Sequence, residues 1–163
     1  MPRSFVGHPN LIVETLEEVC AAYNYEFASN PNKLWGNNEW NRINCQIKAP
    51  KFKAHFEVQQ MPGCCAVLIA SYLDPKPYTQ NNFVTLVGTI GNAAYEAGFG
   101  SMMLSQVVRP RTKPKEHIWG PLLDMGWVMS EPFINAKSGN QVVYLTVNLA
   151  QKGKREGLEI PVA

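Results

Sequence analysis

Four cations stand at alternate positions in the stretch QVVRPRTKPKEH, residues 106–117. They are Arg109, Arg111, Lys113 and Lys115. The prolines between them discourage a helix, so we expect an extended loop that presents its charge to water. High charge density suits the capture of phosphate groups, and arginine can add paired hydrogen bonds to a phosphate or carboxylate. We therefore predict a ligand-binding loop here, although charge runs on protein surfaces more often serve only solubility.

A second candidate site is the stretch KLWGNNEWNR, residues 33–42, which combines aromatic, amide and cationic side chains. Its candidate ligand-binding residues are Trp35, Asn37, Asn38, Trp40 and Arg42. Indole rings can stack on a base or a sugar, and asparagine can read hydrogen-bonding edges, so the combination suits nucleotide or single-strand recognition. The commoner alternative is that both indoles cover an edge of the core while the asparagines form turns.

Alternating polar residues in two consecutive predicted strands form a third surface. They are Arg42, Asn44, Gln46, Lys48, Lys53, His55 and Glu57. Whatever the register of the two strands, the two-residue period places these side chains on one face of a sheet. We expect a solvated face opposite the helices, which could extend a binding surface formed by the tryptophan-containing stretch.

The sequence contains no recognisable motif for catalysis or metal binding. Its three histidines lie in different predicted elements, and none has a second metal-ligating residue at a suitable spacing. There is no G-x-S-x-G nucleophile elbow and no glycine-rich phosphate-binding loop. Carboxylates that could meet only in the folded chain are Glu26, Glu39, Glu57, Asp74, Glu96 and Asp124. We therefore predict no catalytic residues, no metal site and no cofactor.

Two long helices must position these groups. Over residues 10–24, Ile12, Leu16 and Cys20 recur at helical spacing and form an apolar stripe. Over residues 80–97 a second stripe ends at Gly98, which is well placed to terminate the helix. A short helical turn is expected around residues 118–124.

Strands account for most of the remaining predicted structure. The predicted strands cover residues 42–48, 52–58, 64–73, 102–108, 127–134 and 141–149. The first two alternate between apolar and polar residues, as half-buried strands do, whereas the third is almost unbroken apolar sequence. The last two flank a Ser-Gly-Asn turn and form a predicted C-terminal hairpin.

These elements predict an α+β fold: a mainly antiparallel sheet, made of a three-strand meander and a C-terminal hairpin, with two helices on one face. We expect one domain over residues 1–150 and a polar, flexible tail over residues 151–163. The order helix, three strands, helix also occurs in double-stranded RNA-binding domains. The second helix here opens with TQNNFVTLVG and lacks the cations of that family, so we assign the chain to no family.

The predicted compartment is the reducing cytoplasm. No apolar run approaches the roughly 18 residues that span a bilayer. The first ten residues, MPRSFVGHPN, lack the apolar centre of a signal peptide. All four cysteines lie in apolar settings, as buried reduced thiols do.

From these features we favour a non-enzymatic module that binds a polyanionic partner, a nucleic acid or nucleotide-like ligand, through the basic and tryptophan-containing stretches. The net charge of +2 neither supports nor opposes this partner. The alternative is a protein-interaction or assembly subunit, such as part of a homo-oligomer or a viral particle. A small enzyme with dispersed carboxylates ranks third.

Overall fold

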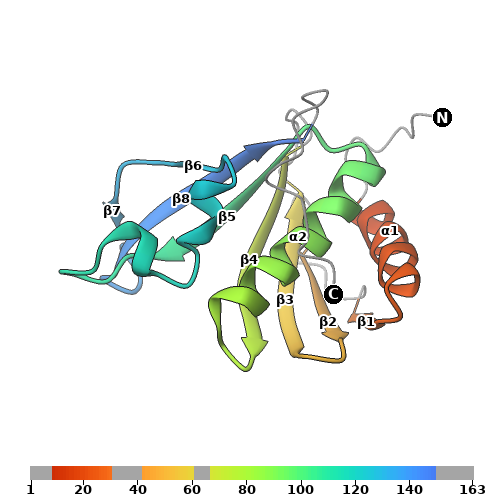
Figure 1. The fold of residues 1–163 in the computed structure, drawn as a ribbon. Helices are drawn as coiled ribbons and strands as arrows, with labels where there is room; N and C mark the ends of the chain where they lie inside the picture. The colour runs from red at the N-terminus through yellow and green to blue at the C-terminus, as the bar shows by residue number, and fades with distance from the viewer. Residues whose placement is uncertain (1–8, 31–41, 61–66, 150–163) are drawn as a thin grey trace.

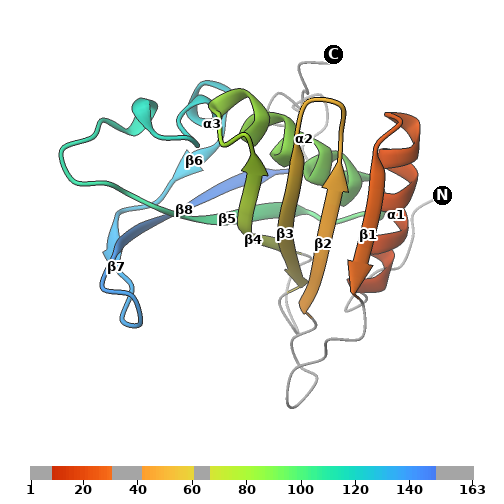
Figure 2. The same ribbon diagram turned by 90° about the horizontal axis from the view of Figure 1, so that it is seen from below.

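In the computed structural model, the chain forms one mixed β-sheet with helices packed against it (Figure 1 and Figure 2). The structure describes residues 9–30, 42–60 and 67–149. Within these ranges the helices are α1 (Pro9–Ala22), α2 (Gln80–Ala97) and α3 (Pro121–Asp124), with a 3₁₀ turn η1 (Pro114–Glu116). The strands are β1 (Glu26–Asn30), β2 (Arg42–Lys48), β3 (Lys53–Gln60), β4 (Val67–Lys76), β5 (Ser101–Val107), β6 (Val128–Met129), β7 (Phe133–Ile134) and β8 (Gln141–Asn148). The sheet order is β1-β2-β3-β4-β5-β8-β6, and β7 pairs separately with β8.

The two long helices lie side by side on one face of the sheet (Figure 1). In α1, Ile12 and Leu16 are fully buried. α2 begins after Thr79, whose side-chain oxygen accepts a hydrogen bond from the N–H of Asn82. It ends at Gly98, which has a φ of 96°, a conformation that glycine adopts without steric cost. Both predicted helices are confirmed, with ends within two residues of those expected.

Strands β1 to β4 form an antiparallel meander in which alternate side chains face the helices. In β2, Ile43, Cys45 and Ile47 are buried, and in β3, Ala54 and Phe56 are buried. The polar residues between these positions therefore occupy the opposite face of the sheet. The alternation predicted for the first of these strands is confirmed over residues 43–48, and in β3 it holds up to Phe56, but Glu57, predicted on the solvated face, is buried.

The sheet as a whole is mixed, so the predicted fold class, mainly antiparallel with two helices on one face, is wrong. β4 and β5 are parallel neighbours that α2 connects. A strand–helix–strand connection returns the chain in its original direction and so joins parallel strands. A third helix, α3, follows β5. The periodic patterns locate strands along the chain but do not state which strands become neighbours.

β4 and β5 pair over only four residues and then diverge (Figure 1 and Figure 2). Residues 67–70 pair with residues 101–104. Just beyond, β4 contains a bulge, because Tyr72 and Leu73 together occupy the space opposite Phe56 of β3. Tyr72 has a φ of 54°, which is uncommon for a residue with a side chain. Past the bulge, the facing edges of β4 and β5 have no strand partner among the described residues.

The predicted C-terminal hairpin is only partly correct. In place of one strand over residues 127–134, the short strands β6 and β7 both pair with β8. Between them, the Ser130 hydroxyl accepts a hydrogen bond from the N–H of Tyr144, so a side chain replaces part of the ladder. β8 also pairs along its whole length with β5, which makes it an interior strand.

Two observations bear on the predicted compartment. No helix within the described ranges is long and apolar enough to cross a membrane. Cys20 and Cys45 are free and buried, and burial raises the pKa of each thiol to about 12. Both thiols therefore stay protonated and unreactive at neutral pH. Cys64 and Cys65 lie outside the described residues.

Candidate functional site

A cavity of about 430 Å³ opens where β4 and β5 diverge, and we call it the cleft. Three segments supply its walls: the connection from β4 to α2, the end of β5, and residues 108–120, which we call the basic segment. Its lining residues include Tyr78 and Gln80 from the first, Gln106 and Val107 from the second, and Arg109, Thr112, His117 and Trp119 from the third. The cleft is therefore a product of strand divergence, with polar groups on each side.

The basic segment is folded around two buried side chains, His117, of which 5% is exposed, and Trp119, of which 1% is exposed. The Nε2 of His117 accepts a hydrogen bond from the backbone N–H of Arg109 at 2.9 Å, and its Nδ1 lies 3.0 Å from the carbonyl oxygen of Lys113. The imidazole ring stacks on Trp119 with 4.5 Å between ring centroids. The Trp119 N–H donates to the carbonyl oxygen of Val107 at 3.1 Å. The segment is an ordered turn rather than the extended loop that its prolines suggested.

Gln80, in the first turn of α2, joins the basic segment to the helix. Its side-chain nitrogen donates to the carbonyl oxygens of His117 at 2.7 Å and Lys115 at 3.3 Å. Gly120 passes close to the same region, since a Cβ there would lie 2.3 Å from the Lys115 carbonyl oxygen. The Lys115 ammonium in turn pairs with Asp124 of α3 at 3.1 Å. This wall of the cleft is thus held from both α2 and α3.

The start of α2 adds hydrogen-bond donors to the cleft. The N–H of Asn82 is taken by the Thr79 cap, whereas the N–H groups of Gln80 and Asn81 have no acceptor within the described residues. Such N–H groups at a helix N-terminus carry partial positive charge. Of these two residues, Gln80 lines the cleft together with Arg109, whereas Asn81 does not.

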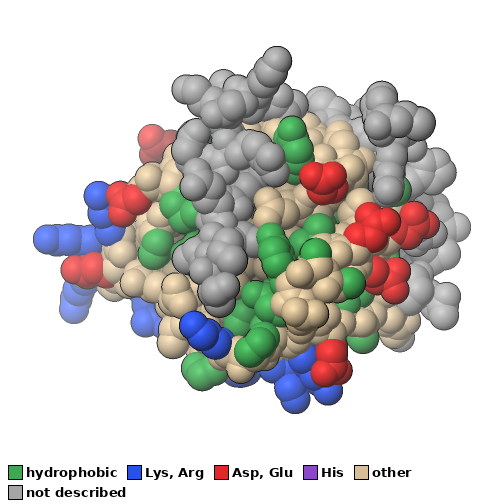
Figure 3. Space-filling model, turned by 45° about the vertical axis from the view of Figure 1, so that its right-hand side comes forward, with side chains coloured by type: hydrophobic (Ala, Val, Ile, Leu, Met, Phe, Trp, Pro, Cys, Tyr) green, Lys and Arg blue, Asp and Glu red, His purple; other side chains and the backbone are tan. Residues whose placement is uncertain are grey.

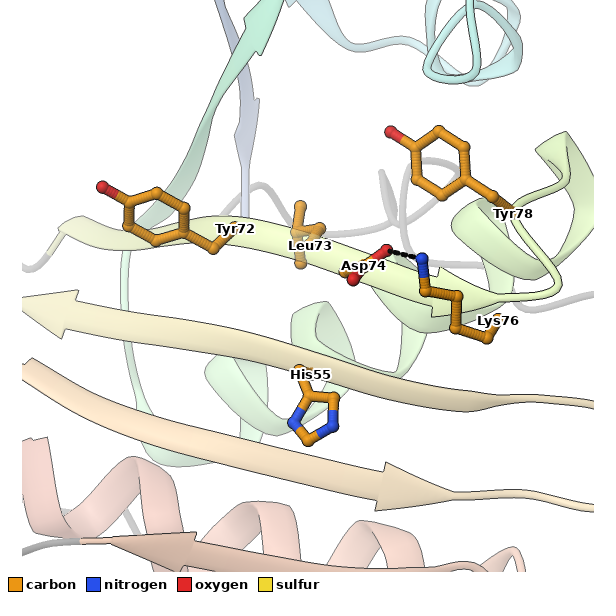
Figure 4. A pocket seen from close by; sticks show the side chains of 6 residues that line it. All are labelled: His55, Tyr72, Leu73, Asp74, Lys76 and Tyr78. Carbon is orange, nitrogen blue, oxygen red and sulfur yellow. Dashed lines mark ion pairs between the residues drawn. The ribbon is translucent and has the colours of Figure 1, made fainter.

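A second pocket, of about 610 Å³, lies along β3 and β4 (Figure 4). It is lined by His55, Tyr72, Leu73, Asp74, Lys76 and Tyr78. His55 and Asp74 are direct cross-strand neighbours, and Asp74 forms an ion pair with Lys76 at 3.3 Å. Tyr72, at the bulge, is 76% exposed. The second pocket thus brings carboxylate, imidazole and phenol groups together beside the point where β4 leaves β5.

Tyr78 lines both the cleft and the second pocket. Its pKa is raised above the ordinary tyrosine value, first by burial and then by the carboxylate of Asp74. The charges of Arg109 and Lys76 act in the opposite direction but are outweighed. The phenol therefore keeps its proton at neutral pH and can donate a hydrogen bond into either space.

The structure separates the four cations that were predicted to act together. Arg109 lines the cleft, whereas Lys115 is engaged with Asp124. Arg111 and Lys113 are exposed and line neither of the two cavities described above. Figure 3 shows Lys and Arg side chains projecting at one end of the molecule, with acidic side chains among them. Of the four, Arg109 is the one placed to reach a ligand in the cleft.

The tryptophan-containing stretch cannot be placed in the same way. Trp35, Asn37, Asn38 and Trp40 lie outside the described residues. Arg42 has its backbone in β2, opposite Gln59 of β3, and its side chain is outside the description. Their part in ligand binding stays a prediction.

Sequence reasoning did not select Tyr78, Gln80 or His117 as site residues. Tyr78 and Gln80 flank the cap of a predicted helix, where side chains often bind backbone groups rather than ligands. His117 stands two residues before Trp119, a spacing that gives no sign of a stacked pair in a turn. Their positions depend on the divergence of β4 and β5, for which the sequence carries no motif.

No family model and no curated protein matches the chain. Solved structures do resemble it. The N-acetyltransferase from Staphylococcus aureus Mu50 matches with a TM-score of 0.52 at 13% identity, over 88% of this chain and 94% of that chain. A candidate acetyltransferase matches with a TM-score of 0.55 at 16% identity, over 99% of this chain and 92% of that chain. A candidate acetyltransferase of the GNAT family from Desulfovibrio desulfuricans matches with a TM-score of 0.50 at 7% identity, over 77% of this chain and 99% of that chain.

The chain has the GNAT acetyltransferase fold. This finding corrects the predicted non-enzymatic binding module and its nucleic-acid partner, because the structures that share the GNAT fold are described as acetyltransferases. The prediction relied on cations and indoles, which occur in many kinds of surface. The cleft of this GNAT-fold chain arises instead from strand geometry.

Proposed function

We propose that the chain transfers an acetyl group from a thioester donor such as acetyl-CoA to an amine, in the cleft formed by the β4–α2 connection, the end of β5 and the basic segment. The observation that carries this proposal is the divergence of two parallel strands above a polar cavity, in a chain with the GNAT fold. The N-acetyltransferase with which it shares this fold is named for the same reaction class.

The residues of the cleft fit the chemical parts of acetyl-CoA. Its extended arm carries amide groups, and the edges of β4 and β5 beyond residues 70 and 104 have no strand partner among the described residues, although the Val107 carbonyl oxygen is already bound by Trp119. Its phosphates need positive charge, which Arg109 and the N–H group of Gln80 at the start of α2 would supply in a cleft that also contains the carboxylate of Glu116. No glycine lies between Gly63 and Gly88, so a glycine-lined phosphate loop is not the device used here.

The two cavities divide the chemistry of the transfer. The amine nitrogen attacks the carbonyl carbon, a C–N bond forms, and the C–S bond breaks, so one proton must leave nitrogen and one must reach sulfur. His55 and Asp74 in the second pocket are groups that can accept the proton, directly or through water. Tyr78, which is protonated at neutral pH, can pass its phenolic proton to the departing sulfur and regain one from water.

The same proposal places the chain in a reducing compartment such as the cytoplasm. There Cys20 and Cys45 would remain thiols, as their burial without a disulfide requires. Recovery of the chain from its source with all four thiols reduced, measured by alkylation and mass spectrometry, checks this.

The direct test is incubation of the purified full chain with acetyl-CoA and a panel of amines: a diamine, a lysine-containing peptide and an aromatic amine. We expect release of the CoA thiol that requires both the protein and an amine. Absence of thiol release, together with no heat of acetyl-CoA binding in calorimetry, would contradict the proposal.

Arg109→Ala sharpens the test. We expect it to weaken acetyl-CoA binding about tenfold, because it removes a charge-assisted contact to phosphate. Lys113→Ala is the matched control, since it removes one cation from the same segment without touching the cleft. Equal effects of the two variants would show that only the net charge of the segment matters.

A further inference from the structure

The proposed transfer does not explain the most ordered feature of the basic segment, the ring of His117. The ring is buried, and both of its nitrogens lie within hydrogen-bonding distance of backbone groups. Because Nε2 faces the N–H of Arg109, it must accept and therefore carries no proton. Nδ1 faces the carbonyl oxygens of Lys113 at 3.0 Å and Pro114 at 3.3 Å, so it carries the proton and donates. These partners fix one neutral tautomer.

These hydrogen bonds close the turn that carries Arg109. The N–H of Thr112 donates to the Arg109 carbonyl oxygen at 3.3 Å, and Arg111 has a φ of 63°, so the chain reverses within residues 109–112. His117 bridges the base of this reversal, since it binds Arg109 on one side and Lys113 on the other. The position of Arg109 at the cleft therefore depends on the imidazole.

We infer that His117 is a positioning residue, which holds Arg109 against the cleft only while its imidazole is neutral. A second proton on Nε2 would set an N–H group directly against the Arg109 N–H, and the hydrogen bond would be lost. The reversal would then open and withdraw the guanidinium from the cleft. The consequence for the acyl donor rests on the proposed function, whereas the closing of the turn does not.

The charged groups around the His117 ring would not compensate for the hydrogen bond that is lost when the ring gains a second proton. On its own segment the ring has the cations Arg109, Lys113 and Lys115 and the carboxylate of Glu116. From the β4–α2 connection it faces Tyr78, and from α2 the uncharged Gln80. Asp124 of α3 is already engaged with Lys115. Within the described part of the chain, no carboxylate forms an ion pair with His117 that would hold the protonated ring in place.

The turn can be tested on the free protein by NMR between about pH 8 and about pH 5, the range over which histidines commonly titrate. The imidazole nitrogen shifts should show the tautomer with the proton on Nδ1 at the upper end. The backbone amide signal of Arg109 should move together with the ring signals as the pH falls. A ring protonated on Nε2 at neutral pH, or an Arg109 amide indifferent to the ring, would overturn the inference.

The effect on the donor is measured as acetyl-CoA affinity over the same pH range. The wild-type chain should lose about tenfold in affinity at the acid end, the usual worth of one charge-assisted contact. The phosphates of acetyl-CoA also titrate there, so a variant without the imidazole is required. His117→Gln provides it, because its side-chain oxygen can still accept from the Arg109 N–H.

We expect His117→Gln to keep most of the neutral-pH affinity and to show a much smaller loss in acid. Arg109→Ala should bind acetyl-CoA more weakly at neutral pH and should also lose less affinity than the wild type as the pH falls. An acid loss in His117→Gln equal to that of the wild type would assign the effect to the ligand and overturn the inference. If acetyl-CoA binds at no pH, the proposed function fails and so does the role of Arg109 toward the donor. The NMR result would then still decide whether His117 closes the turn.

Discussion

Two regions of the molecule, α1 to β4 (the first half) and β5 to β8 (the second half), are stabilised by different kinds of interaction. From α1 to β4, the face that each residue occupies follows mostly from alternation or helical period, and most buried side chains are apolar, although Thr15, Glu57 and Gln59 are buried as well. From β5 to β8, the chain path depends on single hydrogen bonds from side chains to the backbone, made by Gln80, His117, Trp119 and Ser130. The first half is therefore stabilised mainly by its packing, whereas the position of the second half, which forms walls of the cleft, depends on a few polar contacts.

The largest effect should come from a packing residue of the first half. Ile47→Ala in β2 removes a side chain with no exposed surface and should lower the free energy of unfolding by about 3 kcal/mol. Urea denaturation measures the loss. A loss below about 1 kcal/mol, a size typical of a partly exposed site, would show that packing of Ile47 does not stabilise the first half.

A smaller loss should follow from crowding the basic segment. Gly120→Ala places a methyl group against the Lys115 carbonyl oxygen and should cost about 2 kcal/mol. Trypsin should then cleave after Arg111 faster than in the wild type. Gly126→Ala is the control, since its Cβ meets nothing within 4 Å and its cost comes from a φ of 99° alone. Equal acceleration of cleavage in both variants would contradict the close contact.

Alkaline pH tests the first half by another route. Burial raises the pKa of the Cys45 thiol to about 12, above the value of an unfolded thiol. The neutral thiol therefore contributes stability below about pH 9, and this contribution is lost as the pH rises toward 12, by about 1.4 kcal/mol per pH unit. Cys45→Ala should lack this part of the slope in unfolding free energy against pH. Parallel slopes for the two chains would show that the thiol is not buried in the folded protein.

The smallest effect should come from one hydrogen bond of the second half. Trp119→Phe keeps an aromatic ring beside His117 but removes the donor to the Val107 carbonyl oxygen, which should cost about 1 kcal/mol. Amide exchange should rise in the basic segment and stay unchanged in β2. A rise of similar size in both regions would mean that the bond supports the whole fold rather than this wall.

Part of this architecture could be predicted from the sequence. The helical stripe of Ile12 and Leu16, the stop at Gly98, and the alternation through Ile43 and Ile47 each depend on near neighbours, so they could be located. The parallel pairing of β4 with β5 could also be predicted, because a strand, a long helix and a further strand follow one another in the sequence. The interpretation of residues 64–73 as the last strand of an antiparallel meander did not include this parallel neighbour.

The candidate site was less accessible to prediction. Arg109 could be selected because local charge density is visible in sequence. Its separation from Arg111 and Lys113 could not, because that depends on the turn closed by His117. The bulge at Tyr72 is hidden for a similar reason: an apolar run has no polar alternation to reveal a change of phase.

That bulge has a consequence for how such a cleft could originate. One additional residue in β4 shifts the phase of everything after it, so Ala70 and Leu73, three positions apart, are both buried. Deletion of Tyr72 would remove the bulge and restore an uninterrupted ladder between β3 and β4. β4 and β5 could then stay paired to their ends. A chain lacking Tyr72 should keep β4 and β5 paired over more residues, and its structure would show whether one inserted residue is enough to separate the two strands.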